Sequence, residues 1–295
     1  MTVAEAWQLG REHLTAHGID EAAITAEVLL RHALNCSRTD LYRAWDRAVD
    51  GEAWSRYQDY LAERVRRRPV AYIAGHREFM GLDFLVDERV LIPRPETEVL
   101  VEFLLEVLRG IPSPVIADIG TGSGAIAVSL AHVRPDAALI ATDISPAALE
   151  VARANAARHE VADRIRFRTG DLLDPVTAEV AAMGRRFDAV ACNPPYVDRE
   201  AAAALPPEIR EFEPRVAVVA EDGAEVFHLR LARAALGVLR PGGWLVMEVS
   251  AGQAPRVVEL LHRVAYEAVQ TRKDGLGWER AVAARLRVAD LEETV

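Results

Sequence analysis

The hydrophobic pattern divides this chain into two parts of different character. Before about residue 70, apolar residues recur at helical spacing, as Val3, Trp7 and Leu14 do, and we expect four helices there. From residue 115 onward, short apolar runs such as 115–117 and 187–192 alternate with stretches of helical periodicity. This alternation is typical of a parallel sheet covered by helices on both faces. The sequence therefore predicts a helical N-terminal part followed by an α/β domain.

Between these two parts, the pattern predicts a hairpin and a helix start. Two short β-rich runs lie on either side of Gly81, which favours a tight turn between paired strands. The next segment, 92–98, reads Ile-Pro-Arg-Pro-Glu-Thr-Glu. Pro95 suits the first position of a helix, and acidic residues follow it. We expect a helix to run from there to about residue 109, and two paired strands at 266–270 and 280–286 to end the chain.

Glycine and acidic residues follow the first three predicted strands of the α/β part. The first is followed by 118–124, Asp-Ile-Gly-Thr-Gly-Ser-Gly, whose glycines allow a tight turn and close approach of the backbone to a ligand. The second ends at Asp143, whose carboxylate can accept both hydroxyls of a ribose. The third ends at Asp171 and Leu172. The Asp171 carboxylate can accept from the amine of adenine, and the apolar side chain of Leu172 can pack on the adenine ring. We therefore expect a nucleoside site at this edge of the sheet.

A further strand, 187–192, is followed by Asn193-Pro194-Pro195-Tyr196. Two prolines cannot continue a central strand, so the chain turns out of the sheet here. The Asn193 side-chain oxygen and the Pro194 carbonyl can accept both N–H bonds of an –NH2 group, and Tyr196 can stack on a flat substrate. This arrangement suits methylation of a planar nitrogen. The combination with the nucleoside site favours a methyltransferase over a dehydrogenase, whose glycine spacing also differs.

Composition and charge narrow the alternatives. The formal net charge is −10, which argues against a broad surface for nucleic acid. The two cysteines, Cys36 and Cys192, form no disulfide framework or metal spacing, so we expect a reducing, cytoplasmic location and no metal. The N-terminus has no signal-peptide pattern, and no apolar run approaches the roughly 20 residues that a membrane span needs. We therefore expect neither nucleic-acid binding nor membrane insertion.

The motifs together resemble a known family. Residues 68–73, the hairpin, the 92–98 loop, the 118–124 turn and Asn193 to Tyr196 are similar, in the same order, to motifs of the protein-(glutamine-N5) methyltransferases of the HemK/PrmC type, which modify bacterial peptide-chain release factors. The resemblance covers nearly the whole chain. The Asn-Pro-Pro-Tyr motif is shared with adenine methyltransferases, whereas the 92–98 loop and the helical N-terminus are narrower features. Leu172 stands where some members carry an aromatic residue.

The resemblance implies a fold, a donor and a substrate. The fold is an α/β, Rossmann-like, seven-stranded class I methyltransferase sheet with an N-terminal helical bundle. It implies a substrate-recognition domain at 1–75, a β-hairpin linker at 76–91 and a methyltransferase domain at 92–295. S-adenosyl-L-methionine gives its methyl group to a glutamine amide of a release factor, and S-adenosyl-L-homocysteine is the product. The residues that we expect to bind the donor are Gly120, Thr121, Gly122, Ser123, Gly124, Asp143, Asp171, Leu172 and Asn193; Asn193, Pro194 and Tyr196 act in catalysis, and these three with Pro195 bind the substrate.

Three alternatives stay open. One is a glutamine methyltransferase that acts on a ribosomal protein. Another is an adenine-specific nucleic-acid methyltransferase with the same acceptor motif. The third is a binding module that keeps a cofactor pocket without catalysis. The oligomeric state is open as well.

Overall fold

The computed structural model describes residues 1–288, and they divide into two compact units. The first, the helical unit, comprises Met1–His76 together with Pro206–Phe212. The second, the sheet unit, comprises Arg77–Leu205 and the described residues from Glu213 onward. Each has its own hydrophobic core. The helices of the helical unit are α1 (Val3–Ala16), α2 (Ala22–Leu34), α3 (Arg38–Arg43), α4 (Gly51–Val65), α5 (Val70–Ala74) and α10 (Pro207–Phe212).

Side-chain caps fix the helix starts in the helical unit. Thr2 and Glu5 form a reciprocal capping box at the start of α1. The Ser37 hydroxyl accepts from the Asp40 backbone N–H and so fixes the start of α3. The four predicted helices are confirmed as α1 to α4. The short α5 was not predicted, and neither was the association of α10 with this unit, where Glu208 pairs with Arg64 at 2.9 Å.

Seven strands of the described chain form one sheet in the order β10-β11-β9-β6-β3-β4-β5. The strands β3, β4, β5, β6 and β9 are parallel, whereas β11 pairs antiparallel with both β9 and β10. The predicted seven-stranded sheet and its terminal strand pair are thus confirmed. The bounds are β3 (Val115–Ile119), β4 (Ala138–Asp143), β5 (Ile165–Thr169), β6 (Phe187–Cys192), β9 (Leu239–Glu248), β10 (Tyr266–Lys273) and β11 (Glu279–Leu286).

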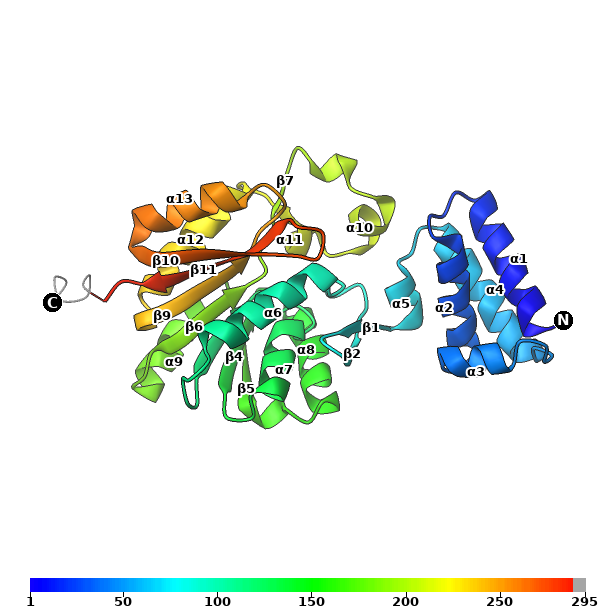
Figure 1. Cartoon of the computed structure of the whole chain (residues 1–295), viewed down its shortest axis with the longest axis horizontal. Helices are drawn as coiled ribbons and strands as arrows, with labels where there is room; N and C mark the ends of the chain where they lie inside the picture. Colours follow the sequence, from blue (N-terminus) through cyan, green and yellow to red (C-terminus); the bar gives the residue numbers. More distant parts are fainter. Residues whose placement is uncertain (289–295) are drawn as a thin grey trace. The chain divides into compact units, whose positions relative to one another are not determined.

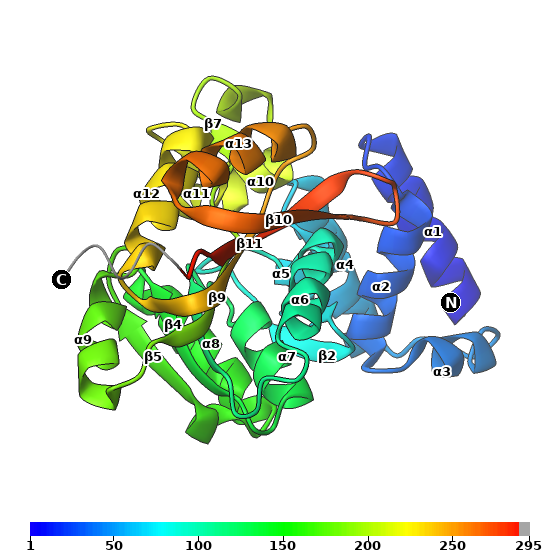
Figure 2. The ribbon, with the colours of Figure 1, turned by 60° about the vertical axis from the view of Figure 1, so that its left-hand side comes forward.

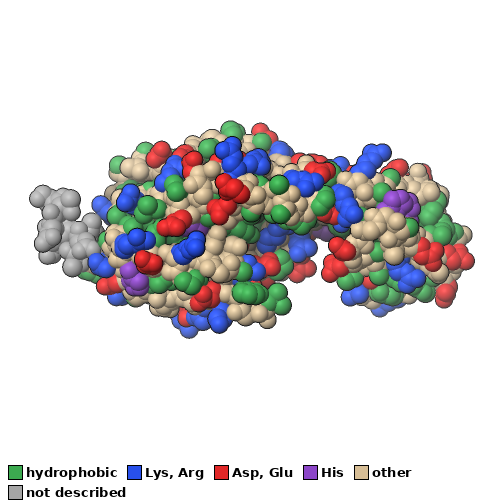
Figure 3. All heavy atoms as spheres, turned by 90° about the horizontal axis from the view of Figure 1, so that it is seen from above, with side chains coloured by type: hydrophobic (Ala, Val, Ile, Leu, Met, Phe, Trp, Pro, Cys, Tyr) green, Lys and Arg blue, Asp and Glu red, His purple; other side chains and the backbone are tan. Residues whose placement is uncertain are grey.

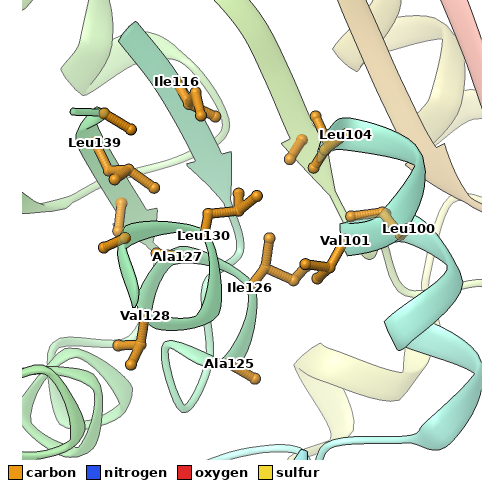
Figure 4. Packing of buried hydrophobic residues seen from close by; sticks show 14 of the residues in the cluster. Leu100, Val101, Leu104, Ile116, Ala125, Ile126, Ala127, Val128, Leu130 and Leu139 are labelled. Carbon is orange, nitrogen blue, oxygen red and sulfur yellow. The ribbon is translucent and has the colours of Figure 1, made fainter. Parts of the chain in front are cut away.

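Helices cover both faces of this sheet (Figures 1 and 2). One face packs α6 (Pro95–Val107), α7 (Ala125–Val133) and α8 (Pro146–Arg158). Figure 4 shows Val101 of α6 facing Ile126 of α7 within this core. The other face packs α9 (Asp174–Met183), α12 (Ala224–Leu236) and α13 (Ala254–Val264). Burial on both faces explains why the central strands read as unbroken apolar runs.

The predicted hairpin is present as β1 (His76–Phe79) and β2 (Leu82–Leu85). Its two loop residues, Met80 and Gly81, have φ of 51° and 74°, as a type I′ turn requires. Phe79 and Phe84 pack into the core between the hairpin and α6. The hairpin is therefore anchored to the sheet unit by apolar burial.

The segment after β6 contains several short elements. Two two-residue strands in it, β7 (Val197–Asp198) and β8 (Val219–Ala220), pair in parallel. Between them lie the 3-10 turn Ala202–Ala204, α10 and α11 (Arg215–Val218), and another 3-10 turn, Ala162–Arg164, precedes β5. Each is too short to give a periodic signal in the sequence.

The surface of the sheet unit that faces the viewer in Figure 3 carries basic and acidic side chains interspersed. Among the described residues, no helix has both the length and the apolar character to cross a membrane.

Candidate active site

A pocket lies at the carboxyl ends of β3, β4, β5 and β6, the edge at which open parallel sheets bind ligands. It encloses about 980 Å³, counting the part that opens to solvent. The structure brings most of the predicted donor residues together here, although they come from four separate loops. The predicted residues that line it are Gly120, Thr121, Gly122, Ser123, Asp143, Asp171, Leu172, Asn193 and Pro195.

The glycine turn after β3 lines the pocket with bare backbone. Gly120 and Gly122 have φ of 69° and 55°, and a Cβ built on either would meet no atom within 4 Å. Any side chain there would project into open space that a ligand can fill. Gly124 behaves differently and does not line the pocket: its Cβ would lie 3.2 Å from the Cβ of Ala152 in α8. Gly124 therefore allows the start of α7 to pack closely on α8, which the sequence did not indicate.

Asp143 ends β4 at the rim of this turn. Its two carboxylate oxygens accept hydrogen bonds from the backbone N–H groups of Gly122 and Ser145, each at 2.9 Å. Burial raises the pKa of Asp143, and these backbone donors act in the opposite direction. Because each carboxylate oxygen has two lone pairs, both can still accept a hydroxyl from a ligand. The geometry thus fits the predicted contact to a ribose.

Asp118 stabilises the glycine turn through hydrogen bonds. It is fully buried, and its Oδ2 accepts from the Thr121 hydroxyl at 2.6 Å and from the Ala127 backbone N–H at 3.2 Å. Burial raises the pKa of Asp118 to about 7. Its Oδ1 has no hydrogen-bond partner within residues 1–288. Asp118 connects the turn to the start of α7 without lining the pocket.

Asp171 and Leu172 line the pocket next to the glycine turn. Asp171 is about half exposed and forms an ion pair with Arg230 at 2.5 Å, a partner that the sequence pattern did not reveal. Leu172 has φ of 45°, and its carbonyl accepts from the Thr142 hydroxyl at 3.1 Å. This bond ties the loop after β5 to β4 and fixes the position of the Leu172 backbone at the pocket wall.

Asn193 lines the donor pocket, as Pro195 of the same motif does. Its Nδ2 donates to the Thr97 hydroxyl at 3.1 Å, so its side-chain oxygen is not used in that contact. Pro194 is buried and Tyr196 is half-buried, and neither lines the pocket. Burial raises the pKa of Tyr196 to about 12, and its carbonyl accepts from Gln253 at 3.2 Å. The motif is therefore held from both sides, by α6 and by the start of α13.

Sequence reasoning missed the groups that surround the acceptor motif. Thr97 lies in the first turn of α6, and Glu248 ends β9; both are buried. Arg94 forms an ion pair with Glu213, which also accepts from the Ile92 backbone N–H at 3.3 Å. The only local signal for these residues was the polar content of the 92–98 loop, because Glu213 and Glu248 arrive from distant parts of the chain.

The pocket fits an adenosyl methyl donor. The backbone of Gly120 and Gly122 forms a cradle that side chains would fill, and Asp143 offers paired carboxylate oxygens beside it. Leu172 supplies apolar surface, and Asn193 brings the acceptor motif to the same pocket. The ribose and the adenine of a nucleoside with a sulfonium side chain therefore each have a partner of suitable chemistry.

Comparison with known proteins agrees with this geometry. Residues 5–75 match the family model "PrmC N-terminal domain", and residues 96–207 match "Methyltransferase small domain". A release factor glutamine methyltransferase from Moorella thermoacetica is 41% identical over 289 residues, covering 97% of this chain and 99% of the relative. One from Cereibacter sphaeroides is 40% identical over 290 residues, covering 98% and 100%.

A solved structure supports the fold. The catalytic domain of hMettl16, in complex with a MAT2A 3'UTR hairpin, aligns with a TM-score of 0.58 at 20% identity, covering 79% of this chain and 83% of that one. This likeness shows a shared methyltransferase fold. Taken with the curated relatives, which match over almost their whole length, it leads to one conclusion: this chain belongs to the release factor glutamine methyltransferase family.

Proposed function

We propose that this enzyme transfers the methyl group of S-adenosyl-L-methionine to the side-chain amide nitrogen of a glutamine in a peptide-chain release factor. The observation that carries the proposal is Asn193, which is fixed by Thr97 at the wall of a pocket suited to an adenosyl donor. The relatives at about 40% identity are named for release factor glutamine methylation, which supports the choice of substrate.

Each donor-site residue contacts a different part of the cofactor. The backbone of Gly120, Thr121, Gly122 and Ser123 lies against it, and Asp143 accepts its ribose hydroxyls. Leu172 and Asp171 provide the apolar and acidic contacts for adenine, Asp171 sharing its carboxylate with Arg230. When bound, S-adenosyl-L-methionine supplies a methyl group on a sulfonium, an electrophile with a good leaving group.

The acceptor residues orient the glutamine amide. The Asn193 side-chain oxygen and the Pro194 carbonyl each accept one N–H bond, which turns the nitrogen lone pair toward the donor. Tyr196, whose pKa burial raises to about 12, is a neutral phenol that stacks on the flat amide. Positioning matters here because an amide nitrogen is a weak nucleophile. The methylated nitrogen gives up one proton to solvent.

We further propose that the chain works as three segments. Residues 1–75 recognise the protein substrate, 76–91 form a hairpin linker, and 92–295 hold the donor and acceptor sites. The separate core of the helical unit and its match to the PrmC N-terminal domain support this division. A ribosomal protein is the second candidate substrate, but no observation in this chain favours it. The net charge of −10 argues against nucleic acid.

Methyl transfer to purified release factors tests the proposal. The enzyme is incubated with isotopically labelled S-adenosyl-L-methionine and a release factor, and mass spectrometry locates the label. We expect one methyl group on one glutamine, and no label when that glutamine is replaced by alanine. Label on a ribosomal protein or an oligonucleotide, and not on the release factor, would contradict the proposal.

A further inference from the structure

The buried carboxylate of Glu248 lies next to the acceptor motif, and the proposed mechanism does not use it. Met247 of β9 pairs with Cys192 of β6, so Glu248 and Asn193 are the next residues on two neighbouring parallel strands. Glu248 is 2% exposed, and its Oε2 has no hydrogen-bond partner within residues 1–288. A carboxylate is expensive to bury, and a half-satisfied one more so. Such a group calls for an explanation beyond packing.

Thr97 connects this carboxylate to Asn193. Its side chain is buried and accepts from Asn193 Nδ2 at 3.1 Å, and its hydroxyl is near enough to the Glu248 carboxylate to lower the pKa of that group. A hydroxyl has one hydrogen to donate, and a charged carboxylate can only accept. Beside a charged Glu248, the Thr97 hydroxyl therefore directs its hydrogen toward that carboxylate and accepts from Asn193. The two contacts fix one orientation of the Asn193 amide, with its –NH2 group on Thr97 and its oxygen free.

We propose that Thr97 and Glu248 are positioning residues that hold the Asn193 side-chain oxygen in place to accept an N–H of the substrate amide. The inference rests on the proposed function. If the Asn193 amide were flipped, its –NH2 group would meet the –NH2 group of the substrate, two donors with no acceptor between them. Neither Thr97 nor Glu248 touches the reacting atoms; both act through Asn193.

The charge of Glu248 decides which group donates and which accepts along the series Glu248, Thr97 and Asn193. A protonated Glu248 can donate to Thr97, which frees the Thr97 hydroxyl to donate to the Asn193 oxygen and favours the flipped amide. Burial raises the pKa of Glu248 to about 7, and the negative charge of Glu96 acts in the same direction. The Thr97 hydroxyl and the positive charges of Arg280 and Arg94 act in the opposite direction. The other titratable groups that face Glu248 are Tyr196, Cys192 and His228. Burial raises the pKa of Tyr196 and of Cys192, and it lowers the pKa of His228.

These three groups stay neutral through the range in which Glu248 titrates. A thiol and a phenol with raised pKa keep their protons near pH 7, and a histidine with lowered pKa lacks its second one. Among the groups that face it, Glu248 is therefore the one whose charge changes there; Asp118, whose pKa is also about 7, lies on β3, on the other side of β6. We expect the rate of methyl transfer to fall as the pH drops through about 7.

Single-turnover methylation of a release factor at saturating donor tests the positioning role. Thr97→Val keeps the shape and removes the hydroxyl, and Glu248→Gln removes the charge. We expect each to lower the transfer rate by roughly 10- to 100-fold, because a misplaced group acts mainly in the transition state. The affinity for S-adenosyl-L-methionine and the KM for the release factor should change by less than about threefold, since Asn193 itself remains.

Two matched variants complete the set. Thr97→Ser retains the hydroxyl and should restore most of the rate. Thr271→Val removes a comparable threonine-to-glutamate hydrogen bond, to Glu279 at 2.9 Å between β10 and β11, and should leave the rate unchanged. A Thr97→Val enzyme as fast as wild type, a Thr97→Ser enzyme as slow as Thr97→Val, or a loss confined to KM would overturn the inference.

A second readout does not need activity. The chain has asparagine only at positions 35, 155 and 193, so asparagine-selective 15N labelling gives three side-chain amide signals. We expect the Asn193 signal, identified by its absence in Asn193→Asp, to shift with an apparent pKa near 7 in wild type and not in Glu248→Gln. The same titration in both proteins would overturn the inference. Failure of wild type to methylate a release factor would instead count against the proposed function, and the NMR result would stand apart from it.

Discussion

At the scale of single residues, the candidate site depends on carboxylates and amides whose partners come from far along the chain. The sequence identified Asp143, Asp171 and Asn193 because each directly follows a predicted strand. It could not identify Thr97 or Glu248, because only tertiary packing brings them to Asn193. The local sequence pattern is thus enough to point to polar residues at strand ends. It is not enough to point to the residues that orient their side chains.

Asp143→Ala should weaken the binding of S-adenosyl-L-methionine. The substitution removes the two oxygens proposed to accept the ribose hydroxyls, and loss of hydrogen bonds to a charged group costs about 1.5–3 kcal/mol. Isothermal titration calorimetry measures the change. Asp136→Ala, which removes a surface aspartate paired with Arg134, is the control. Equal affinity of Asp143→Ala and wild type would show that Asp143 serves only the turn.

Asp118 should make stability depend on pH. Burial raises its pKa from 3.8 to about 7, so the folded state holds this proton more tightly than the unfolded state does. Its contribution to stability is complete below about pH 4 and is lost as the pH rises through about 7. Asp118→Asn stays neutral and lacks this loss. The Tm of wild type minus that of the variant should therefore decrease between pH 4 and 8; a constant difference would refute this assignment.

At the scale of elements, the alternation of apolar runs predicted the four parallel strands that carry the site and the terminal strand pair. The curated relatives confirm the predicted family, and the hMettl16 alignment confirms the fold class. Neither α9 nor α13 was among the predicted elements. It also assigned Gly124 to the donor site, whereas the structure gives it a packing role against Ala152. Close helix packing and close ligand approach both select glycine, so sequence alone could not separate them.

Asn155 joins three elements and should be important for stability. Its buried side chain accepts from the Leu85 backbone N–H at 2.7 Å and donates to the carbonyls of Leu85 and Ser123 at 3.0 and 2.9 Å. Asn155→Leu leaves these backbone groups without partners, a loss of roughly 2–4 kcal/mol. Thermal unfolding should show a Tm lower by roughly 5–15 °C.

The control removes a hydrogen bond of the same kind at the surface. Thr177 in α9 donates to the Leu173 carbonyl at 3.3 Å and is exposed. Thr177→Val should leave the Tm within a few degrees of wild type. If Asn155→Leu were equally mild, the end of β2 and the glycine turn would not depend on this side chain.

At the scale of the whole molecule, the helical unit contributes no residue to the pocket, yet it has a complete core of its own. We expect deletion of residues 1–76 to leave binding of S-adenosyl-L-methionine intact and to abolish methylation of an intact release factor. Calorimetry and circular dichroism check the binding and the fold of the truncated enzyme. A folded, truncated enzyme that methylates the factor at the wild-type rate would rule out a recognition role for this unit.

The central claim is that Asn193 orients a substrate amide for methyl transfer, and single-turnover methylation of a release factor by Asn193 variants tests it most directly. Asn193→Ala removes the acceptor, so the rate should fall by about 10²–10³-fold with only a small change in donor affinity. Asn193→Asp keeps an acceptor oxygen and the shape of the side chain, and should retain partial activity. A rate for Asn193→Ala close to that of wild type would contradict the mechanism.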